Sequence, residues 1–421
     1  MIKVMNSSWA LFLGMFMLMI GNGLQGTLLG LRGNLEGFST LALSIVMSAY
    51  FVGFLFSSQV TPKLIRRVGH VRVFAALGST ISAVLIMYPI LVEPWAWTLG
   101  RVIIGFCFCG VYITAESWLN DANGNETRGK ALSIYLMVQM AGIVAAQYIV
   151  SQGDVGGYAL FIIPSVLVSM AFAPILLSIR PTPQFAQTKP MTIRRLIQAS
   201  PLGCMGMFLL GGVFSAQFGM SAVYGSQVGL TVGQISLFVS VIYIAALVAQ
   251  YPIGWMSDRI DRRILILWIA VVGGAGALIA FFIPGNFTII LVSAAILGGT
   301  SNPLYALLIA YTNDYLERED MAAASGGLLF INGIGAIAGP LIVGYMMETL
   351  GANAFWLFSS VLMFLVGIYA AYRMTRRSRG ENEFDPTAYA PISSASSPVL
   401  AEVAQELYVD AEEEEEKHPT T

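Results

Sequence analysis

The sequence predicts an all-α membrane protein in which twelve transmembrane helices form two related six-helix bundles. Three observations lead to this prediction. The 421 residues are 56% hydrophobic and only 11% charged, whereas a soluble domain carries about a quarter charged residues. The apolar residues fall into twelve long runs, and the second six runs repeat the first six. We expect a pseudo-two-fold axis along the membrane normal to relate the two bundles.

The apolar runs come in two sets of six, separated by a polar segment. Lipid offers the backbone no hydrogen bonds, so each run should form a helix, and about 20 residues are needed to cross the membrane. The first set covers residues 9–29, 41–60, 72–92, 96–117, 130–150 and 157–179. The second set covers residues 202–223, 233–254, 264–284, 287–309, 322–347 and 354–373. The expected domains are an N-terminal six-helix bundle (1–179), a cytoplasmic linker (180–200) and a C-terminal six-helix bundle (201–373).

Lysine and arginine residues gather on one side of the predicted helices. With the N-terminus inside the cell, twenty of the 22 Lys and Arg residues fall in cytoplasmic segments. The other two are Arg32, in the first outside loop, and Arg101, inside a helix. Cytoplasmic loops of membrane proteins carry the excess of Lys and Arg. We therefore expect a multi-pass protein of the bacterial inner membrane with both termini in the cytoplasm.

The C-terminal tail, residues 374–421, is rich in Ser, Pro and Glu and contains the acidic run Glu412–Glu416. Such a segment buries too little apolar area to offset its ordering entropy. We expect a disordered cytoplasmic tail. A regulatory or partner-binding role and a solvated tail of no special role both stay open.

The chain aligns with itself in one register. At a shift of 192 or 193 residues, like residues coincide at several positions: Gln25 with Gln217, Gly105 with Gly298, Tyr112 with Tyr305, and Asn120-Asp121 with Asn313-Asp314. Shared hydrophobicity would not align polar residues in this way. Six helices per repeat is an even number, so both halves insert with the same orientation. A substrate site is then expected at their interface, near the middle of the membrane.

The loop between the eighth and ninth runs carries a motif, Gly254-Trp-Met-Ser-Asp258-Arg259-Ile-Asp261-Arg262-Arg263. It resembles the signature of the major facilitator superfamily, G-x-x-x-D-R-x-G-R-R. Asp261 stands where the family has glycine, and we expect it to strain the turn. The resemblance implies a transporter whose cytoplasmic gate includes Gly254, Asp258, Arg259, Arg262 and Arg263, with Asp121 and Asp314 as partners.

Two other segments extend the resemblance over residues 1–373. Arg101-Val-Ile-Ile-Gly105 is similar to the family's R-x-x-x-G motif on the fourth helix. The segment that begins Ala115-Glu116-Ser117-Trp118 and is followed by Arg128-Gly129 looks most like the YcaD-type branch of bacterial facilitators. That branch implies a transporter fold and no particular substrate.

Arg101 lies within a predicted helix. A central arginine costs about 2.5–3.5 kcal/mol on insertion scales, so its side chain should face the bundle interior or water. Its repeat mate is Ala294, which indicates a role in one half only. We interpret Arg101 as a substrate-anion clamp or a coupling element. The alternative is a structural arginine bonded to backbone carbonyls of adjacent helices.

Glu116 follows Arg101 on the same helix, roughly 22 Å further along at 1.5 Å per residue. It therefore cannot pair with Arg101. A carboxylate in such a shielded place could take up a proton during transport. The alternative is a gate-stabilising ion pair with Arg66, Arg67 or Arg128.

Neutral polar residues within the predicted helices are candidates for the cavity lining. They are Asn22, Gln25, Gln139, Gln147, Gln217 and Asn332. Among them, Gln217 is the repeat mate of Gln25, and Asn332 is the mate of Gln139. Each alone could instead hydrogen-bond two helices together, which contributes about 0.6 kcal/mol on average.

These features predict a secondary active transporter that moves a small organic solute by alternating access. Proton-coupled export is the leading hypothesis for its mode of transport. Proton-coupled uptake, facilitated diffusion and, less expected, a transporter-like sensor stay open. We do not expect an enzyme, because His70 and His418 are far apart and no nucleotide-binding glycine loop occurs. No cofactor, metal or nucleic acid is expected. The expected partners are the solute, protons and membrane lipids, and the expected state is a monomer.

Overall fold

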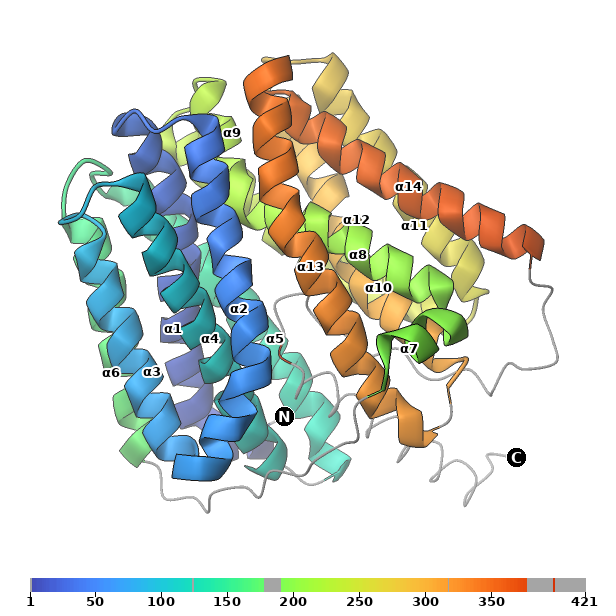
Figure 1. Ribbon diagram of the computed structural model, residues 1–421, viewed down its shortest axis with the longest axis horizontal. Helices are drawn as coiled ribbons and strands as arrows, with labels where there is room; N and C mark the ends of the chain where they lie inside the picture. Colours follow the sequence, from blue (N-terminus) through green and yellow to red (C-terminus); the bar gives the residue numbers. More distant parts are fainter. Residues whose placement is uncertain (1, 123–124, 178–190, 317, 377–396, 398–421) are drawn as a thin grey trace.

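The structure is a computed structural model that describes residues 2–122, 125–177, 191–316, 318–376 and 397. Within these residues every regular element is a helix (Figure 1). The first half contains α1 (Ile2–Leu35), α2 (Thr40–Val68), α3 (His70–Met87), α4 (Pro94–Ala122), α5 (Asn125–Gln152) and α6 (Ala159–Leu177). The second contains α8 (Pro201–Ser215), η1 (Ala216–Met220), α9 (Ser221–Gln227), α10 (Val232–Ser257), α11 (Arg262–Phe282), α12 (Phe287–Asn313), α13 (Arg318–Leu350) and α14 (Ala354–Arg376).

Each of the twelve predicted runs lies on a helix, which confirms the predicted fold class. Eleven spans of the described chain are long and apolar enough to cross a membrane, and the described apolar part of α6 is shorter. One of the eleven is Pro201–Gln227, in which α8, η1 and α9 follow one another without a break. The predicted linker contains one further short helix, α7 (Ile193–Ala199). Most of the predicted tail lies outside the described residues.

Polar side chains mark the starts of several helices. Ser39 accepts a hydrogen bond from the backbone N–H of Ala42 and so caps α2. Thr231 and Gln234 form a capping box at the start of α10, in which each side chain bonds the other's backbone N–H. Such caps satisfy backbone donors that a helix leaves unpaired in its first turn.

Asp261 also caps a helix, and the strain expected at this position is wrong. Its φ is −51° and its ψ is 117°, so the backbone does not need glycine there. Its side chain accepts a 2.9 Å hydrogen bond from the backbone N–H of Arg263, at the start of α11. The motif's glycine is thus replaced by a residue that gives the helix its N-cap.

Within each half, helix backbones approach closely at glycines, and these contacts follow the sequence repeat. A Cβ placed on Gly105 of α4 would lie 1.9 Å from the carbonyl oxygen of Tyr50 on α2. The corresponding contact in the second half joins Gly298 of α12 to the carbonyl oxygen of Ile242 on α10, at 2.3 Å. Helices in lipid associate mainly through such close packing. The register predicted from sequence is therefore also a register of contacts.

A second pair of glycine contacts repeats in the same way. A Cβ placed on Gly142 of α5 would lie 2.9 Å from the carbonyl oxygen of Phe16 on α1. A Cβ placed on its repeat mate, Gly335 of α13, would lie 1.9 Å from the carbonyl oxygen of Phe208 on α8. Each half thus has the same internal scaffold, with α1 against α5 and α2 against α4 in the first half.

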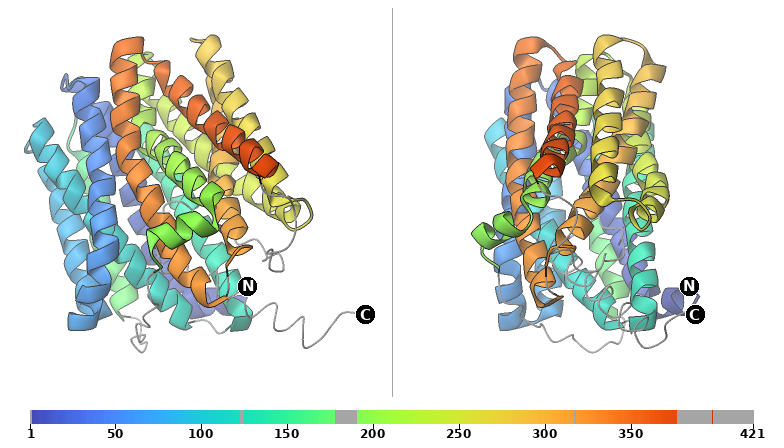
Figure 2. Two further views of the ribbon diagram at one scale, coloured as in Figure 1. Left: turned by 45° about the vertical axis from the view of Figure 1, so that its right-hand side comes forward. Right: turned by 90° about the vertical axis from the view of Figure 1, so that its right-hand side faces the viewer.

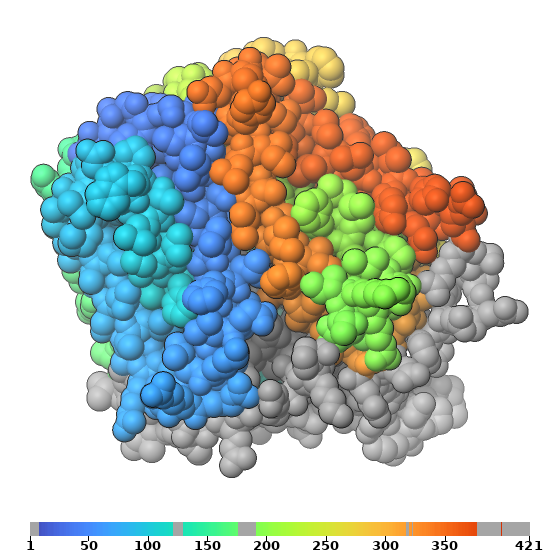
Figure 3. Space-filling view, viewed as in Figure 1, coloured from blue at the N-terminus to red at the C-terminus, as the bar shows by residue number. Residues whose placement is uncertain are grey.

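The two halves meet along two equivalent helix pairs, α2 with α13 and α5 with α10. The α2–α13 contact begins where the backbone N–H of Leu41 bonds the Glu348 carboxylate at 3.1 Å. It continues where the Ser48 hydroxyl donates to the carbonyl oxygen of Ile337 at 2.6 Å. Figures 1 and 2 show α2 and α13 close together at this end and diverging toward the other. In Figure 3 their surfaces meet directly over the upper part of the molecule.

Gly105→Ala tests the closest backbone contact. The added methyl group would meet the carbonyl oxygen of Tyr50, so α2 and α4 would have to separate. We expect a lower unfolding temperature of the purified protein, in keeping with about 1–3 kcal/mol for overpacking. Gly326→Ala is the control, because nothing lies within 4 Å of a Cβ at Gly326. Equal unfolding temperatures for the two variants would contradict this contact.

Candidate functional site

A small cavity lies between the two halves, at the far end of the α2–α13 contact. Its volume is about 30 Å³, enough for one or two water molecules at about 10–15 Å³ each. None of the described residues that line it is charged. Its wall comes from α1, α2, α8, η1 and α13 and consists of Asn22, Tyr50, Phe51, Phe54, Leu55, Ser58, Phe214, Phe218, Leu329, Asn332, Gly333 and Ala336.

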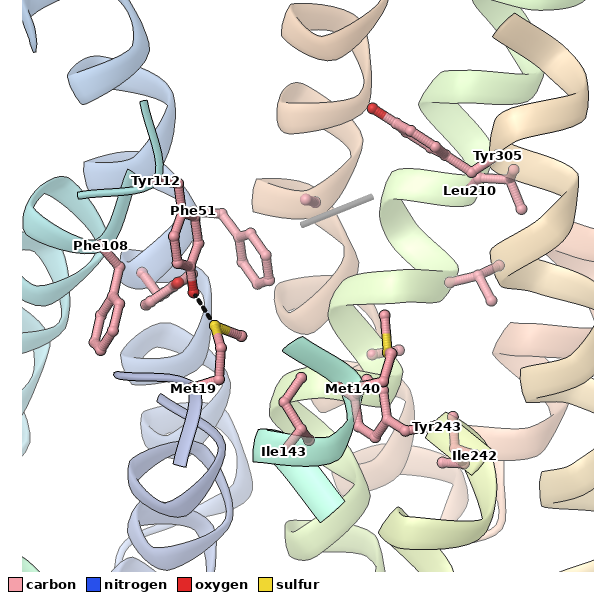
Figure 4. Packing of buried hydrophobic residues seen from close by; sticks show 14 of the residues in the cluster. Met19, Phe51, Phe108, Tyr112, Met140, Ile143, Leu210, Ile242, Tyr243 and Tyr305 are labelled. Carbon is pink, nitrogen blue, oxygen red and sulfur yellow. Dashed lines mark hydrogen bonds between the residues drawn. The ribbon is translucent and has the colours of Figure 1, made fainter. Parts of the chain in front are cut away.

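Aromatic rings from both halves form much of this wall. Phe214 and Phe218 stack with their centroids 5.9 Å apart and an interplanar angle of 20°. From the first half, Tyr50 approaches Phe218 at 5.4 Å and Phe51 approaches Phe214 at 6.1 Å. Figure 4 shows Phe51 pointing from the first half toward the second. These ring contacts connect the halves across the cavity.

These aromatic residues were not among the site residues predicted from the sequence. The chain has 24 Phe and 17 Tyr, so rings within apolar runs do not stand out. A usable signal was the spacing, because Phe51 and Phe54 (i, i+3) and Phe214 and Phe218 (i, i+4) each lie on one face of a helix. Phe218 also lies in η1, a π-helical turn, and such turns are frequent at functional sites.

Asn22 provides the polar part of the wall on the first half. Its side-chain N–H₂ donates to the hydroxyl of Tyr112 at 2.8 Å and to that of Tyr50 at 3.3 Å. The amide of Gln25 donates to the carbonyl oxygen of the Asn22 side chain at 3.0 Å. The Tyr112 hydroxyl in turn donates to the sulfur of Met19, the dashed line in Figure 4. Asn22 is thus held in place by three helices, and Gln25 lies behind it.

Asn332 provides the polar part on the second half. Its amide donates to the carbonyl oxygen of Met207 at 2.9 Å and so ties α13 to α8. Its repeat mate Gln139 is buried on α5 and does not line the cavity. Neither amide atom of Gln139 makes a hydrogen bond of good geometry within the described chain. Of the two mates, only Asn332 therefore lies at the interface cavity.

The remaining two candidate glutamines, Gln147 and Gln217, each join two helices of their own half. Gln147 on α5 accepts from the hydroxyl of Thr27 at 3.0 Å and donates to the carbonyl oxygen of Gly23 at 3.4 Å, both on α1. Gln217 in η1 donates to the hydroxyl of Ser301 on α12 at 3.0 Å. Both are positioned as interhelical contacts, and neither lines the cavity. A direct contact with solute stays a prediction for both.

Arg101 lies directly behind the aromatic wall. Its side chain is fully buried on α4, and its guanidinium carbon lies 4.9 Å from the centroid of the Tyr50 ring and 6.0 Å from that of Phe218. Its Nη2 contacts the sulfur of Met47 at 3.2 Å. Its Nε and Nη1 have no hydrogen-bond partner in the described structure. The backbone-carbonyl bonds of the structural alternative are therefore not seen at these two nitrogens.

Glu116 is buried on α4, one turn beyond Tyr112, and does not line the cavity. The hydroxyl of Tyr135 on α5 donates to its Oε1 at 3.0 Å. The hydroxyl of Ser397 donates to its Oε2, and the backbone N–H of Ser397 approaches Oε1 at 3.5 Å. The side chains of Arg66 and Arg67 are exposed and form no ion pair with it. The third arginine proposed as its partner, Arg128, has a side chain outside the described part.

Two arginines of the loop motif, Arg262 and Arg263, lie at the start of α11, and each binds a carboxylate. Arg262 forms an ion pair with Asp314 at the end of α12 and donates to the hydroxyl of Ser257 at 3.2 Å. Its Nη1 also approaches the carbonyl oxygen of Ala310 at 3.3 Å. Arg262 is only 5% exposed. This ion pair joins the start of α11 to the end of α12.

The other motif residues are distributed around this ion pair. Gly254 is buried on α10, and Asp258 stands at the C-terminal end of that helix. Arg259 is exposed and stacks over the ring of Trp255 at 4.3 Å. Arg263 pairs with Asp261 at 2.9 Å. The side chain of Asp121 lies outside the described part of the chain, so its role as a gate partner stays a prediction.

Asp314→Asn tests the ion pair with Arg262. Breaking a buried pair leaves a charge without its counter-ion, which costs on the order of 3 kcal/mol. We expect a clear fall in the unfolding temperature of the purified protein. Asp320→Asn is the matched control, because its partner Arg195 is 64% exposed and such surface pairs contribute about 0–1 kcal/mol. Equal unfolding temperatures for Asp314→Asn and Asp320→Asn would show that Asp314 does not stabilise the α11–α12 junction.

Comparison with known families gives one match over most of the chain. The model of the Major Facilitator Superfamily matches residues 11–231 and again residues 202–405. An uncharacterised MFS-type transporter of Enterobacter sp. (strain 638) is 26% identical over 388 residues, which cover 90% of this chain and 97% of that protein. The uncharacterised MFS-type transporter YcaD of Salmonella typhimurium is 23% identical, over 84% of this chain and 92% of its own.

Solved structures of the same fold are also similar. The nucleoside transporter NupG has a TM-score of 0.71 at 17% identity and covers 89% of this chain and 100% of its own. A bacterial homologue of the human lysosomal transporter Spinster has a TM-score of 0.67 at 15% identity, over 97% and 98% of the two chains. At such identities the likeness concerns the fold alone.

Proposed function

Because this chain belongs to the major facilitator superfamily, and is therefore a secondary transporter, we propose that it exports a small organic solute in exchange for protons. The observation that carries the proposal is the cavity lined by both halves. A site shared by two bundles can be opened to either side of the membrane when one bundle rocks against the other. Asn22 and Asn332 place one amide from each half at this site.

The contact between the halves supports alternating access. α2 and α13 meet at the end where Leu41 bonds Glu348 and diverge toward the opposite end (Figures 1 and 2). The distribution of Lys and Arg makes the first of these ends extracellular. In that orientation the described conformation is closed to the outside. Rocking one half against the other to open the site to the outside would break the α2–α13 contact.

Glu116 is the proposed proton-binding group. Its carboxylate is buried and accepts hydrogen bonds from Tyr135 and Ser397. A carboxylate in such surroundings can change its protonation when its exposure changes. Among the solved structures of this fold, the fucose:proton symporter FucP carries proton coupling in its name.

Glu116→Gln tests the proton coupling. A thermal-shift screen of the purified protein against metabolites and drugs first supplies a solute. In proteoliposomes, we expect the variant to exchange labelled for unlabelled solute as the wild type does, but to lose accumulation driven by a pH gradient. The reason is that the neutral amide cannot carry the proton. The control is Glu93→Gln, at an exposed carboxylate before α4.

Each other outcome of this experiment selects a different mechanism. Accumulation that survives in Glu116→Gln rules out Glu116 as the coupling group. A wild type that equilibrates the solute without responding to a pH gradient is a facilitator. The sign of the gradient that drives accumulation separates export from uptake.

Cross-linking tests alternating access. The side chains of Thr40 at the start of α2 and Gln227 at the end of α9 are 2.5 Å apart and come from opposite halves. We expect Thr40→Cys with Gln227→Cys to be joined by a short thiol cross-linker and to stop transport until the link is cleaved. The single variants are the controls, since the native Cys107, Cys109 and Cys204 are buried. Undiminished transport by the linked protein would exclude separation of the halves at this end.

A further inference from the structure

We propose that the transported solute is an aromatic monocarboxylate, whose ring enters the aromatic wall and whose carboxylate pairs with Arg101. This inference rests on the proposed transport function. It names the class of solute, which neither the fold nor the similarity to other transporters specifies.

Arg101 has a buried positive charge without a counter-ion among the described residues. The side chain is 0% exposed, and none of the described ion pairs includes it. The guanidinium group keeps its charge in proteins. A buried charge that lacks a partner destabilises the folded state strongly. An anion that reached Arg101 would remove this penalty, so the surroundings of Arg101 favour an anionic ligand.

Arg262 shows what a structural arginine looks like in the same chain. It is buried as well, but its guanidinium binds Asp314, Ser257 and the carbonyl oxygen of Ala310. Arg101 instead has a sulfur contact with Met47 and two nitrogens without partners. The comparison favours a ligand-binding role for Arg101 over a purely structural one.

The guanidinium of Arg101 is separated from the cavity by one layer of rings. Tyr50 and Phe218 both line the cavity, and the centroids of their rings lie 4.9 and 6.0 Å from the guanidinium carbon of Arg101. A change in the rotamer of either ring would connect the cavity to Arg101. Phe218 lies in the π-helical turn η1, where the backbone hydrogen-bond pattern is already irregular.

At about 30 Å³ the cavity is too small for a ring in the described conformation, so a ring would enter when the halves rock apart. Its lining then favours a flat, apolar body. Phe214 and Phe218 present stacked faces, and Phe51 presents its edge to Phe214. Aromatic solutes bind such walls by offset stacking or edge-to-face contact. Asn332 offers a polar substituent on the ring an amide, whereas Asn22 can only accept through its oxygen, because its two N–H groups already bond Tyr50 and Tyr112.

A single arginine favours a single negative charge. The fork of donors on a guanidinium matches the two oxygens of a carboxylate. Among the described residues that line the cavity none is basic, so Arg101 alone would leave a phosphate dianion partly uncompensated. A cationic solute would meet the uncompensated charge of Arg101 and no lining carboxylate. The carboxylate is therefore the anion that this site fits best.

Matched acid–amide pairs test the inference by thermal unfolding of the purified full-length protein. The probes are benzoate against benzamide and phenylacetate against phenylacetamide, in chloride-free buffer. We expect each acid to raise the unfolding temperature and its amide to have little effect. Arg101→Gln should weaken the apparent affinity for the acids by roughly 10–100-fold, the range for a hydrogen bond to a charged group.

The unliganded variants give a second, independent measurement. If Arg101 serves a ligand, Arg101→Gln without ligand should unfold at or above the wild-type temperature, because the variant removes an unpaired buried charge. Arg262→Gln is the matched control and should unfold at a lower temperature, because it removes a paired one. If Arg101→Gln lowered the unfolding temperature as much as Arg262→Gln does, the inference would be overturned.

The remaining outcomes separate this inference from the proposed function. Amides that stabilise the protein as well as the acids do, chloride alone that reproduces the acids' effect, or no effect of any acid would each overturn the solute class. Transport of a neutral solute from the wider screen would leave the transporter function intact in those cases. Acids that bind through Arg101 but are not moved across proteoliposomes would support the site and contradict the transport function.

Discussion

The hydrocarbon interior of a membrane offers no hydrogen-bond partner, and every polar group placed there must find one within the protein. Helices satisfy the backbone, but they do not by themselves hold one helix against another, because lipid tails are as apolar as Leu side chains. Close backbone contacts such as that between Gly105 and Tyr50 supply much of this cohesion. Side-chain bonds between helices, such as Gln147 with Thr27, supply more. Among the described buried atoms without a hydrogen-bond partner, the two nitrogens of Arg101 differ from those of neutral groups such as Gln139 because they belong to a fully buried charged group.

The sequence predicted the helices well because the bilayer fixes their length and the repeat fixes their register. The alignment of Gly105 with Gly298 turned out to be an alignment of helix crossings. The candidate site was less predictable. Gln147 and Asn332 have the same chemistry within apolar runs, yet one faces a neighbouring helix and the other a cavity. Helical spacing places a residue on a face, but only the packing of the other helices decides what that face meets.

The two halves share a scaffold and differ in their chemistry. Arg101 and Glu116 lie in the first half, and the repeat mate of Arg101 is the buried Ala294. The second half contains the ion pair of Arg262 with Asp314, which fastens α11 to α12. Such a division is consistent with a duplicated chain in which packing constrains both copies equally. Charged groups, in contrast, are costly in lipid, so a charge retained in one copy alone indicates a task that only one half performs.

The narrowness of the cavity has a consequence for the membrane as a whole. A space of about 30 Å³ holds one or two water molecules, and rings from both halves form much of its wall. A hydrated ion needs a continuous file of water to cross, and apolar constrictions interrupt such a file. A resting molecule with this constriction would therefore insulate the membrane at its centre. The electrical potential and the ion gradients of the cell would then be preserved between one transport cycle and the next.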